Sequence, residues 1–205
     1  MVRRRKTHRR QRGRARPRVL VICQIPSKHG AIDWEGHEIV GYVDIAEGRS
    51  ARDGVPYYRG WDAVPAELRG TIDIVLSINC PVALAIERGW VSSLDTPPAS
   101  NVDDKQEAFT IITRGLEVLR PGGHLLFPRV VSISPLFKAA VDGKGHTAEV
   151  IEVPKPRWRI LAQSDDYDIN ADYSRDVLPA VRITKGAAGG RRRHPLRSRR
   201  RSMRS

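Results

Sequence analysis

The chain has 205 residues, of which 36 are Lys or Arg and 23 are Asp or Glu, and its formal net charge is +13. This length suits one domain with a sizeable core, and no apolar run approaches the roughly 20 residues of a membrane-spanning helix. Two cysteines, Cys23 and Cys80, are too few for a disulfide framework, so we expect unlinked thiols in a reducing, intracellular compartment.

The positive charge is concentrated at the two ends of the chain. Residues 1–18 hold ten Lys or Arg and residues 191–205 hold eight, with no acidic residue in either segment. The chain between them keeps 18 basic residues against all 23 acidic ones, a net charge of −5. Because like charges repel and such segments bury no apolar side chain, the sequence predicts disordered basic tails at 1–17 and 186–205 and a folded domain at 18–185.

Short apolar runs and amphipathic stretches alternate between the tails. The expected strands are 18–22, 37–45, 55–58, 71–78, 124–130, 146–153 and 180–184. The expected helices are 81–89, 104–119 and 135–142, and the longest of them places Phe109, Ile112, Leu116 and Leu119 on one face. Strands that alternate with helices predict an α/β domain with a mostly parallel sheet.

Two connections between these elements have unusual lengths. Only residues 46–54 separate the second and third expected strands, whereas parallel neighbours usually need a crossover of a dozen or more residues. Either the helix there is reduced to a turn or two, or the third strand is mispredicted. Residues 154–178 are rich in Asp and form a long connection, which suits a solvated loop or a segment that folds over the substrate edge.

The order of these elements resembles the class I S-adenosylmethionine-dependent methyltransferases over about residues 18–185. The resemblance is carried by VGYVDI (40–45), YYRGWDAVP (57–65), IDIVLS (72–77) and GLEVLRPGGHLLF (115–127). It implies a three-layer Rossmann-like fold with reduced helices, whose mostly parallel seven-stranded sheet ends in an antiparallel hairpin. That hairpin would be formed by residues 146–153 and 180–184.

The resemblance also implies where S-adenosylmethionine would bind. Asp44, at the end of the second strand, would accept hydrogen bonds from the two ribose hydroxyls, and Asp62 would bind the adenine amino group. The cofactor-binding residues implied in this way are Cys23, Gln24, Gly30, Asp44, Ile45, Asp62, Ala63, Ser77 and Asn79. As local alternatives, Asp44 caps a turn after its strand and Asp62 is the N-cap of the VPAEL segment that follows.

The sequence departs from the family after the first strand. The family has a glycine-rich loop there, whereas CQIPSKHG (23–30) contains only Gly30, and Pro26 removes a backbone donor. Side chains in this loop would crowd the methionine moiety of the cofactor. No catalytic residue is identified, and no metal site is expected, because Cys23, Cys80 and His29 lack a fourth ligand.

The Arg-rich tails predict a nucleic-acid partner and no membrane partner. Arginine forms bidentate contacts with phosphate, so cations on flexible arms would bind DNA or RNA with little sequence preference and a steep salt dependence. A nuclear or virion location would suit such a protein. The expected phosphate contacts are Arg3, Arg4, Arg5, Arg9, Arg10, Arg12, Arg14, Arg191, Arg192, Arg193, Arg199, Arg200 and Arg201.

Two functions fit these observations. In the first, the protein is an S-adenosylmethionine-dependent methyltransferase that acts on nucleic acid or on a protein bound to it, and Asp44 and Asp62 favour this reading. In the second, the fold has lost its cofactor, and the protein packages or coats nucleic acid as a viral structural or chromatin-like component. The poor glycine content of residues 23–30 and the twin tails favour the second reading. Whether the chain is an enzyme stays open at this point.

Overall fold

A computed structural model describes residues 15–23, 32–44, 54–77, 82–99, 103–154, 158–160 and 177–187. The predicted disordered tails and the Asp-rich connection, expected as a solvated loop or a segment over the substrate edge, lie mostly outside these residues. The strands of the main sheet are β1 (Arg18–Ile22), β3 (Glu38–Asp44), β4 (Tyr57–Arg59), β5 (Ile72–Ser77), β6 (Leu119–Pro128), β7 (Thr147–Pro154) and β9 (Val177–Thr184). The helices are α2 (Val82–Arg88), α3 (Asp103–Val118) and α4 (Pro135–Gly143).

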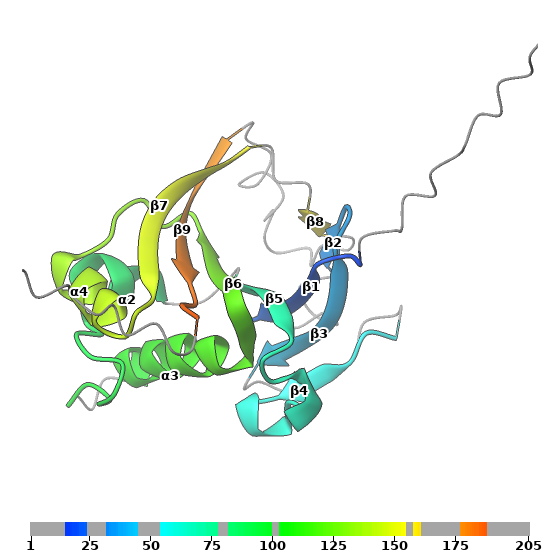
Figure 1. The fold of residues 1–205 in the computed structure, drawn as a ribbon, viewed down its shortest axis with the longest axis horizontal. Helices are drawn as coiled ribbons and strands as arrows, with labels where there is room; N and C mark the ends of the chain where they lie inside the picture. The colour runs from blue at the N-terminus through cyan, green and yellow to red at the C-terminus, as the bar shows by residue number, and fades with distance from the viewer. Residues whose placement is uncertain are drawn as a thin grey trace, which may run out of the picture.

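The seven strands form one sheet in the order β4-β3-β1-β5-β6-β9-β7 (Figure 1). β1 pairs in parallel with β3 and β5, β3 pairs in parallel with β4, and β5 with β6. β9 runs antiparallel between β6 and β7. The structure therefore confirms an α/β domain with a mostly parallel seven-stranded sheet that ends in an antiparallel hairpin.

The third expected strand is present, although it begins two residues later than the sequence predicted. β4 pairs in parallel with β3 and places Arg59 opposite Asp44. After β4 the chain makes two short 3₁₀ turns, η1 (Trp61–Ala63) and η2 (Ala66–Leu68), before it enters β5. Single turns thus stand in this connection where a helix usually lies, as the expectation of reduced helices implied.

The three described helices pack on one face of the sheet. Their buried side chains Ile86, Ile112 and Phe137 share one apolar cluster with Leu20 and Val75 of the sheet. On α3, Ile112 and Leu116 are buried and Phe109 packs against the cluster, as the amphipathic pattern predicted, whereas Leu119 belongs to β6 and not to the helix. None of the described helices is long and apolar enough to cross a membrane.

The opposite face of the sheet is covered differently. Its apolar cluster includes Tyr42 and Leu76, and Ile32 of strand β2 (Ile32–Trp34) packs into it. β2 pairs antiparallel with β8 (Trp158–Ile160), and the Ile32 amide donates to the Tyr42 hydroxyl at 2.9 Å. In the described part of the chain, the third layer is therefore this small sheet, which the sequence did not predict.

The Pro-Gly-Gly turn lies inside β6 as a bulge and does not separate α3 from the strand. Ile72 of β5 lies opposite Leu119, and Ile74 lies opposite His124, so the residues from 120 to 123 bulge out of the register. Gly122 has a φ of 77°, which suits glycine. The bulge is joined to the end of β9, because the Gly122 amide donates to the carbonyl of residue 185 at 2.9 Å.

Asp73 joins the bulge to the first strand at the amino edge of the sheet. Its carboxylate accepts a hydrogen bond from the Arg18 amide at 2.8 Å and pairs with the Arg120 side chain. Burial alone would raise the pKa of Asp73, but the Arg18 amide and the Arg120 guanidinium outweigh burial and hold the pKa below its ordinary value. The amino ends of β1, β5 and β6 are therefore held by one ionised carboxylate.

We predict that Gly123→Ala destabilises the fold because the added Cβ would meet backbone that cannot move freely. A Cβ at Gly123 would lie 2.9 Å from the Asp73 carbonyl oxygen and 3.0 Å from those of Arg120 and Ile72. The free energy of unfolding should fall by about 1–3 kcal/mol in urea denaturation. Gly143→Ala is the matched control, since no atom lies within 4 Å of its Cβ position. Equal effects of the two substitutions would contradict the close approach.

Candidate functional site

The carboxyl ends of the parallel strands meet at one edge of the sheet, which is where α/β proteins bind ligands. Ile22 at the end of β1 lies opposite Val43 of β3 and Ser77 of β5. One residue further on, the Cys23 amide donates to the Val43 carbonyl at 2.9 Å. The register therefore brings Cys23 and Asp44 to the edge at the same level.

A cavity of about 390 Å³ opens between this edge and α3. Its volume falls within the range of roughly 300–1,000 Å³ that is usual for small-molecule sites. The Gly60 amide holds one wall by donating to the Asp44 carbonyl at 2.7 Å. The described lining residues come from β1, β3, the start of η1 and α3, and they are Ile22, Cys23, Val43, Asp44, Gly60, Trp61, Glu107, Thr110 and Ile111.

Two carboxyl groups supply the charge of the cavity. Asp44 comes from β3 and Glu107 from α3, and no Lys, Arg or His occurs among the described lining residues. Burial raises the pKa of Glu107, and the negative charges of Asp44 and Asp104 raise it further. No group of three or more His, Cys, Asp or Glu in the described segments could hold a metal ion. The cavity therefore offers hydrogen-bond acceptors and negative charge between apolar walls.

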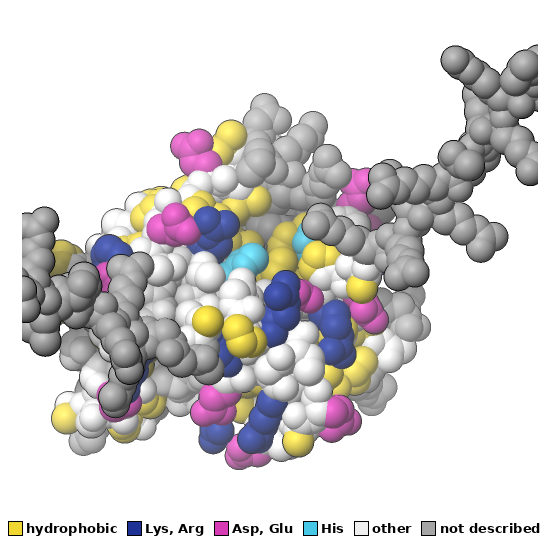
Figure 2. All heavy atoms as spheres, in the orientation of Figure 1, with side chains coloured by type: hydrophobic (Ala, Val, Ile, Leu, Met, Phe, Trp, Pro, Cys, Tyr) yellow, Lys and Arg dark blue, Asp and Glu magenta, His cyan; other side chains and the backbone are white. Residues whose placement is uncertain are grey.

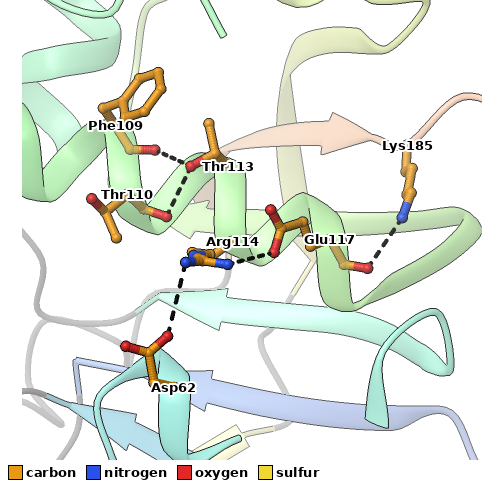
Figure 3. Close-up of polar contacts among 7 residues, drawn as sticks. All are labelled: Asp62, Phe109, Thr110, Thr113, Arg114, Glu117 and Lys185. Atoms are coloured by element: carbon orange, nitrogen blue, oxygen red, sulfur yellow. Dashed lines mark hydrogen bonds and ion pairs between the residues drawn. The ribbon is translucent and has the colours of Figure 1, made fainter. Parts of the chain in front are cut away.

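Polar contacts join α3 to its neighbours, and Figure 3 shows that of Arg114 with Asp62 and that of Lys185 with the Glu117 carbonyl. The Lys185 ammonium donates to the Leu119 carbonyl at 2.7 Å and to the Glu117 carbonyl at 3.3 Å, which satisfies the carboxyl end of α3. Arg114 pairs with Glu117 at 3.1 Å and approaches Asp62 of η1 at 3.8 Å. These contacts fix the helix that carries Glu107 relative to β9 and η1.

The structure brings some of the predicted cofactor residues together and not others. Cys23 and Asp44 line the cavity. Asp62 and Ala63 lie in η1 beside Trp61 but are not among its lining residues, and the Asp62 side chain is 98% exposed. Ser77 is buried at the end of β5 and does not line the cavity either. Gln24, Gly30, Ile45, Asn79 and all the tail arginines predicted to contact phosphate lie outside the described residues.

The expected N-cap role of Asp62 is wrong. Asp62 lies within η1, and the residue that precedes η2 is Pro65, which makes no side-chain capping bond. Pro65, the second residue of VPAEL, is the N-cap of η2 and has φ −56° and ψ 139°. The carboxylate of Asp62 points instead toward Arg114 (Figure 3).

The expectation of unlinked thiols is wrong for Cys23, which is disulfide-bonded. The other cysteine of the sequence, Cys80, follows β5 by three residues and lies outside the described segments. A reducing, intracellular location stays a prediction.

Of the described lining residues the sequence predicted only Cys23 and Asp44, and it missed the polar and aromatic side chains Trp61, Glu107 and Thr110 among the others. In the sequence, Trp61 stands out only as part of YYRGWDAVP, the segment that resembles the family. Glu107 precedes the buried Ile111 by four residues, so both lie on the same face of α3. A carboxylate in line with a buried apolar position was the available signal.

Comparisons with known proteins were made over the whole chain. No protein-family model matches the sequence, and no curated protein matches it either. Among solved structures, one described as the structure of an antibiotic-related methyltransferase is similar to this chain. That likeness covers 83% of this chain and 88% of the other, with a TM-score of 0.44 and 9% sequence identity.

We predict that Glu107→Gln stabilises the ligand-free protein at neutral pH. The pKa of Glu107 is raised in the folded state, so folding favours the protonated carboxyl over the carboxylate. The stability that the protonated form contributes is lost as the pH rises through that raised pKa. The uncharged variant should have a larger free energy of unfolding near pH 7, and this gain should shrink as the pH falls toward about 4. Urea denaturation across this range measures both effects.

Glu117→Gln is the control, because it makes the same chemical change on the same helix at an exposed side chain paired with Arg114. A variant at Glu107 that is no more stable than this control near pH 7 would contradict the prediction.

Proposed function

We propose that the cavity at the carboxyl edge binds S-adenosylmethionine and that the protein is a methyltransferase of the class I type. The observation that carries the proposal is the position of Asp44. This residue ends the second strand of the main parallel set, lines a cavity of ligand size, and lies at the same level as the end of β1. A carboxylate there is suited to accept hydrogen bonds from two adjacent ribose hydroxyls.

The other lining residues fit the same ligand. Ile22, Val43 and Ile111 give the cavity apolar walls against which a purine ring would pack. Trp61 adds an aromatic side chain next to Gly60, whose lack of a side chain leaves backbone open to the cavity. The described lining residues include no basic side chain, and so the site suits a nucleoside without phosphate groups.

The role of the chain in the reaction is to bind and to orient. S-adenosylmethionine supplies a methyl group that is already activated by the positive charge on its sulfur. Asp44 and Glu107 would hold the bound molecule in one orientation, and α3 is itself held by the contacts of Lys185 and Arg114. Because such a transfer depends mainly on positioning, it needs little acid–base machinery from the protein.

We further propose that the methyl acceptor is nucleic acid, or a protein bound to it, held by the Arg-rich tails. The described domain is a poor candidate for this anchoring, because its basic side chains lie beside acidic ones (Figure 2). Arg182, for example, pairs with Glu149 at 2.7 Å, and Lys138 pairs with Asp142 at 3.1 Å. The tails at 1–17 and 186–205 carry seventeen Lys or Arg with no acidic residue among them, since Arg18 belongs to β1.

For the cofactor, Asp44→Ala should weaken binding of S-adenosylmethionine by roughly 1–3 kcal/mol, because hydroxyl groups would lose their buried acceptor. Isothermal titration of the intact chain with S-adenosylmethionine and S-adenosylhomocysteine measures this effect. Asp142→Ala, on α4 and away from the cavity, is the control and should leave the affinity unchanged. Absence of binding to the unaltered chain would reject the methyltransferase and favour a protein that only coats nucleic acid.

For the tails, the affinity of the intact chain for duplex DNA should fall steeply with salt. If about half of the seventeen tail cations meet phosphates, the log–log slope should be about −8, from roughly 0.9 per neutralised phosphate. Replacing the six arginines Arg191, Arg192, Arg193, Arg199, Arg200 and Arg201 by glutamine should reduce that slope and weaken binding at moderate salt. A slope that does not change in this variant would place the nucleic-acid contact elsewhere.

A further inference from the structure

The electrostatic composition of the cavity indicates more than the identity of the nucleoside. Two carboxyl groups face the cavity, and no basic side chain does so among the described lining residues. Asp44 is accounted for by the ribose hydroxyls in the proposed function. Glu107 has no such assignment, and within the described part of the chain its carboxylate makes no hydrogen bond or ion pair.

We propose that Glu107 is a specificity-determining residue, whose negative charge makes the cavity prefer the cationic sulfonium of the methyl donor over the neutral thioether of the product. This inference rests on the proposed function, and it assigns to Glu107 a role that the sequence resemblance gives to no residue of α3.

The backbone around Glu107 keeps the carboxylate at the cavity wall. Glu107 lies on α3 next to Ala108, which is fully buried, and one turn before Ile111, of which 4% is exposed. The carboxyl end of the same helix is held by Lys185. Because the helix is well packed, the Glu107 carboxylate stays near the cavity wall and acts on any ligand bound there.

The charges that line the cavity favour a cationic ligand. Glu107 is partly buried, and burial together with the charges of Asp44 and Asp104 disfavours its ionised form. A positive charge nearby would offset that penalty, and in a partly enclosed site the attraction between unit charges is several times stronger than in water. A neutral ligand of the same shape gains nothing from this term.

A second role for Glu107 would leave a different signature. If the carboxylate accepted a hydrogen bond from the purine amino group, it would support donor and product alike, because both carry the same base. Loss of the charge would then weaken both ligands by the same factor. The ratio of the two dissociation constants therefore separates recognition of the sulfonium from recognition of the base.

Preference for the donor has a direct benefit in catalysis. Transfer of the methyl group leaves the sulfur as an uncharged thioether, and the electron pair of the broken bond stays on that sulfur. The product then loses its attraction to Glu107 at the moment the reaction is complete. The same carboxylate thus favours entry of the donor and departure of the product.

The test is isothermal titration of the full chain with S-adenosylmethionine and with S-adenosylhomocysteine at one fixed pH and salt concentration. The unaltered protein should bind the donor more tightly than the product. Glu107→Gln should reduce that preference roughly three- to tenfold, mainly by weakening binding of the donor. Glu107→Asp keeps the charge and should retain most of the preference, and Asp142→Asn on α4, away from the cavity, should leave it unchanged.

The outcomes separate this inference from the function on which it rests. If both ligands bind and Glu107→Gln weakens them equally, or affects neither, the inference is overturned and the proposed function stands. If neither ligand binds to the unaltered chain, the proposed function fails and the inference fails with it. A loss of preference in both Glu107→Gln and Glu107→Asp would point to shape and not charge, and would also overturn it.

Discussion

Parallel pairing of β1 with both β3 and β5 is the constraint on which the site depends. The register sets Ile22, Val43 and Ser77 at one level, so the residues that follow these strands leave the sheet at the same edge. β1 is buried almost completely from Val19 onward, which leaves little freedom for it to slip. A shift of one residue in β1 would turn each of its side chains to the opposite face of the sheet. Asp44 would then no longer lie at the same level as Cys23.

Among the described residues, few elements surround this edge on the helical side, which leaves room for the cavity. The connection from β4 to β5 contains only η1 and η2, and α3 is the one described helix that lines the cavity. The helix that carries Glu107 is positioned from its far end by Lys185 and, through Arg114, by an exposed pair with Asp62. Exposed pairs contribute little to stability, so the contact with Lys185 is the stronger of the two.

Much of the fold could be predicted from the sequence, because apolar runs and amphipathic stretches indicate which side chains are buried. The seven strands and three helices follow from such runs, and the resemblance gave the antiparallel end of the sheet. β2 and β8 have three residues each, too few for any periodicity, and their pairing joins segments far apart in the chain. For the site, Asp44 could be found at a strand end, whereas Glu107 could not, since its place depends on how α3 packs.

The Asp73 network at the amino edge and Glu107 at the carboxyl edge should make the two ends of the sheet respond oppositely to acidification. The pKa of Asp73 is lowered, so its stabilising contacts with Arg18 and Arg120 weaken as the pH falls through that pKa. The pKa of Glu107 is raised, so acid removes an unfavourable charge from the cavity wall before Asp73 is protonated. Mild acid would therefore relax the electrostatic repulsion around an empty cavity, and only stronger acid would loosen the joint between β1, β5 and β6. In an acid titration followed by amide hydrogen exchange, protection should be lost first where Asp73 holds the strands together.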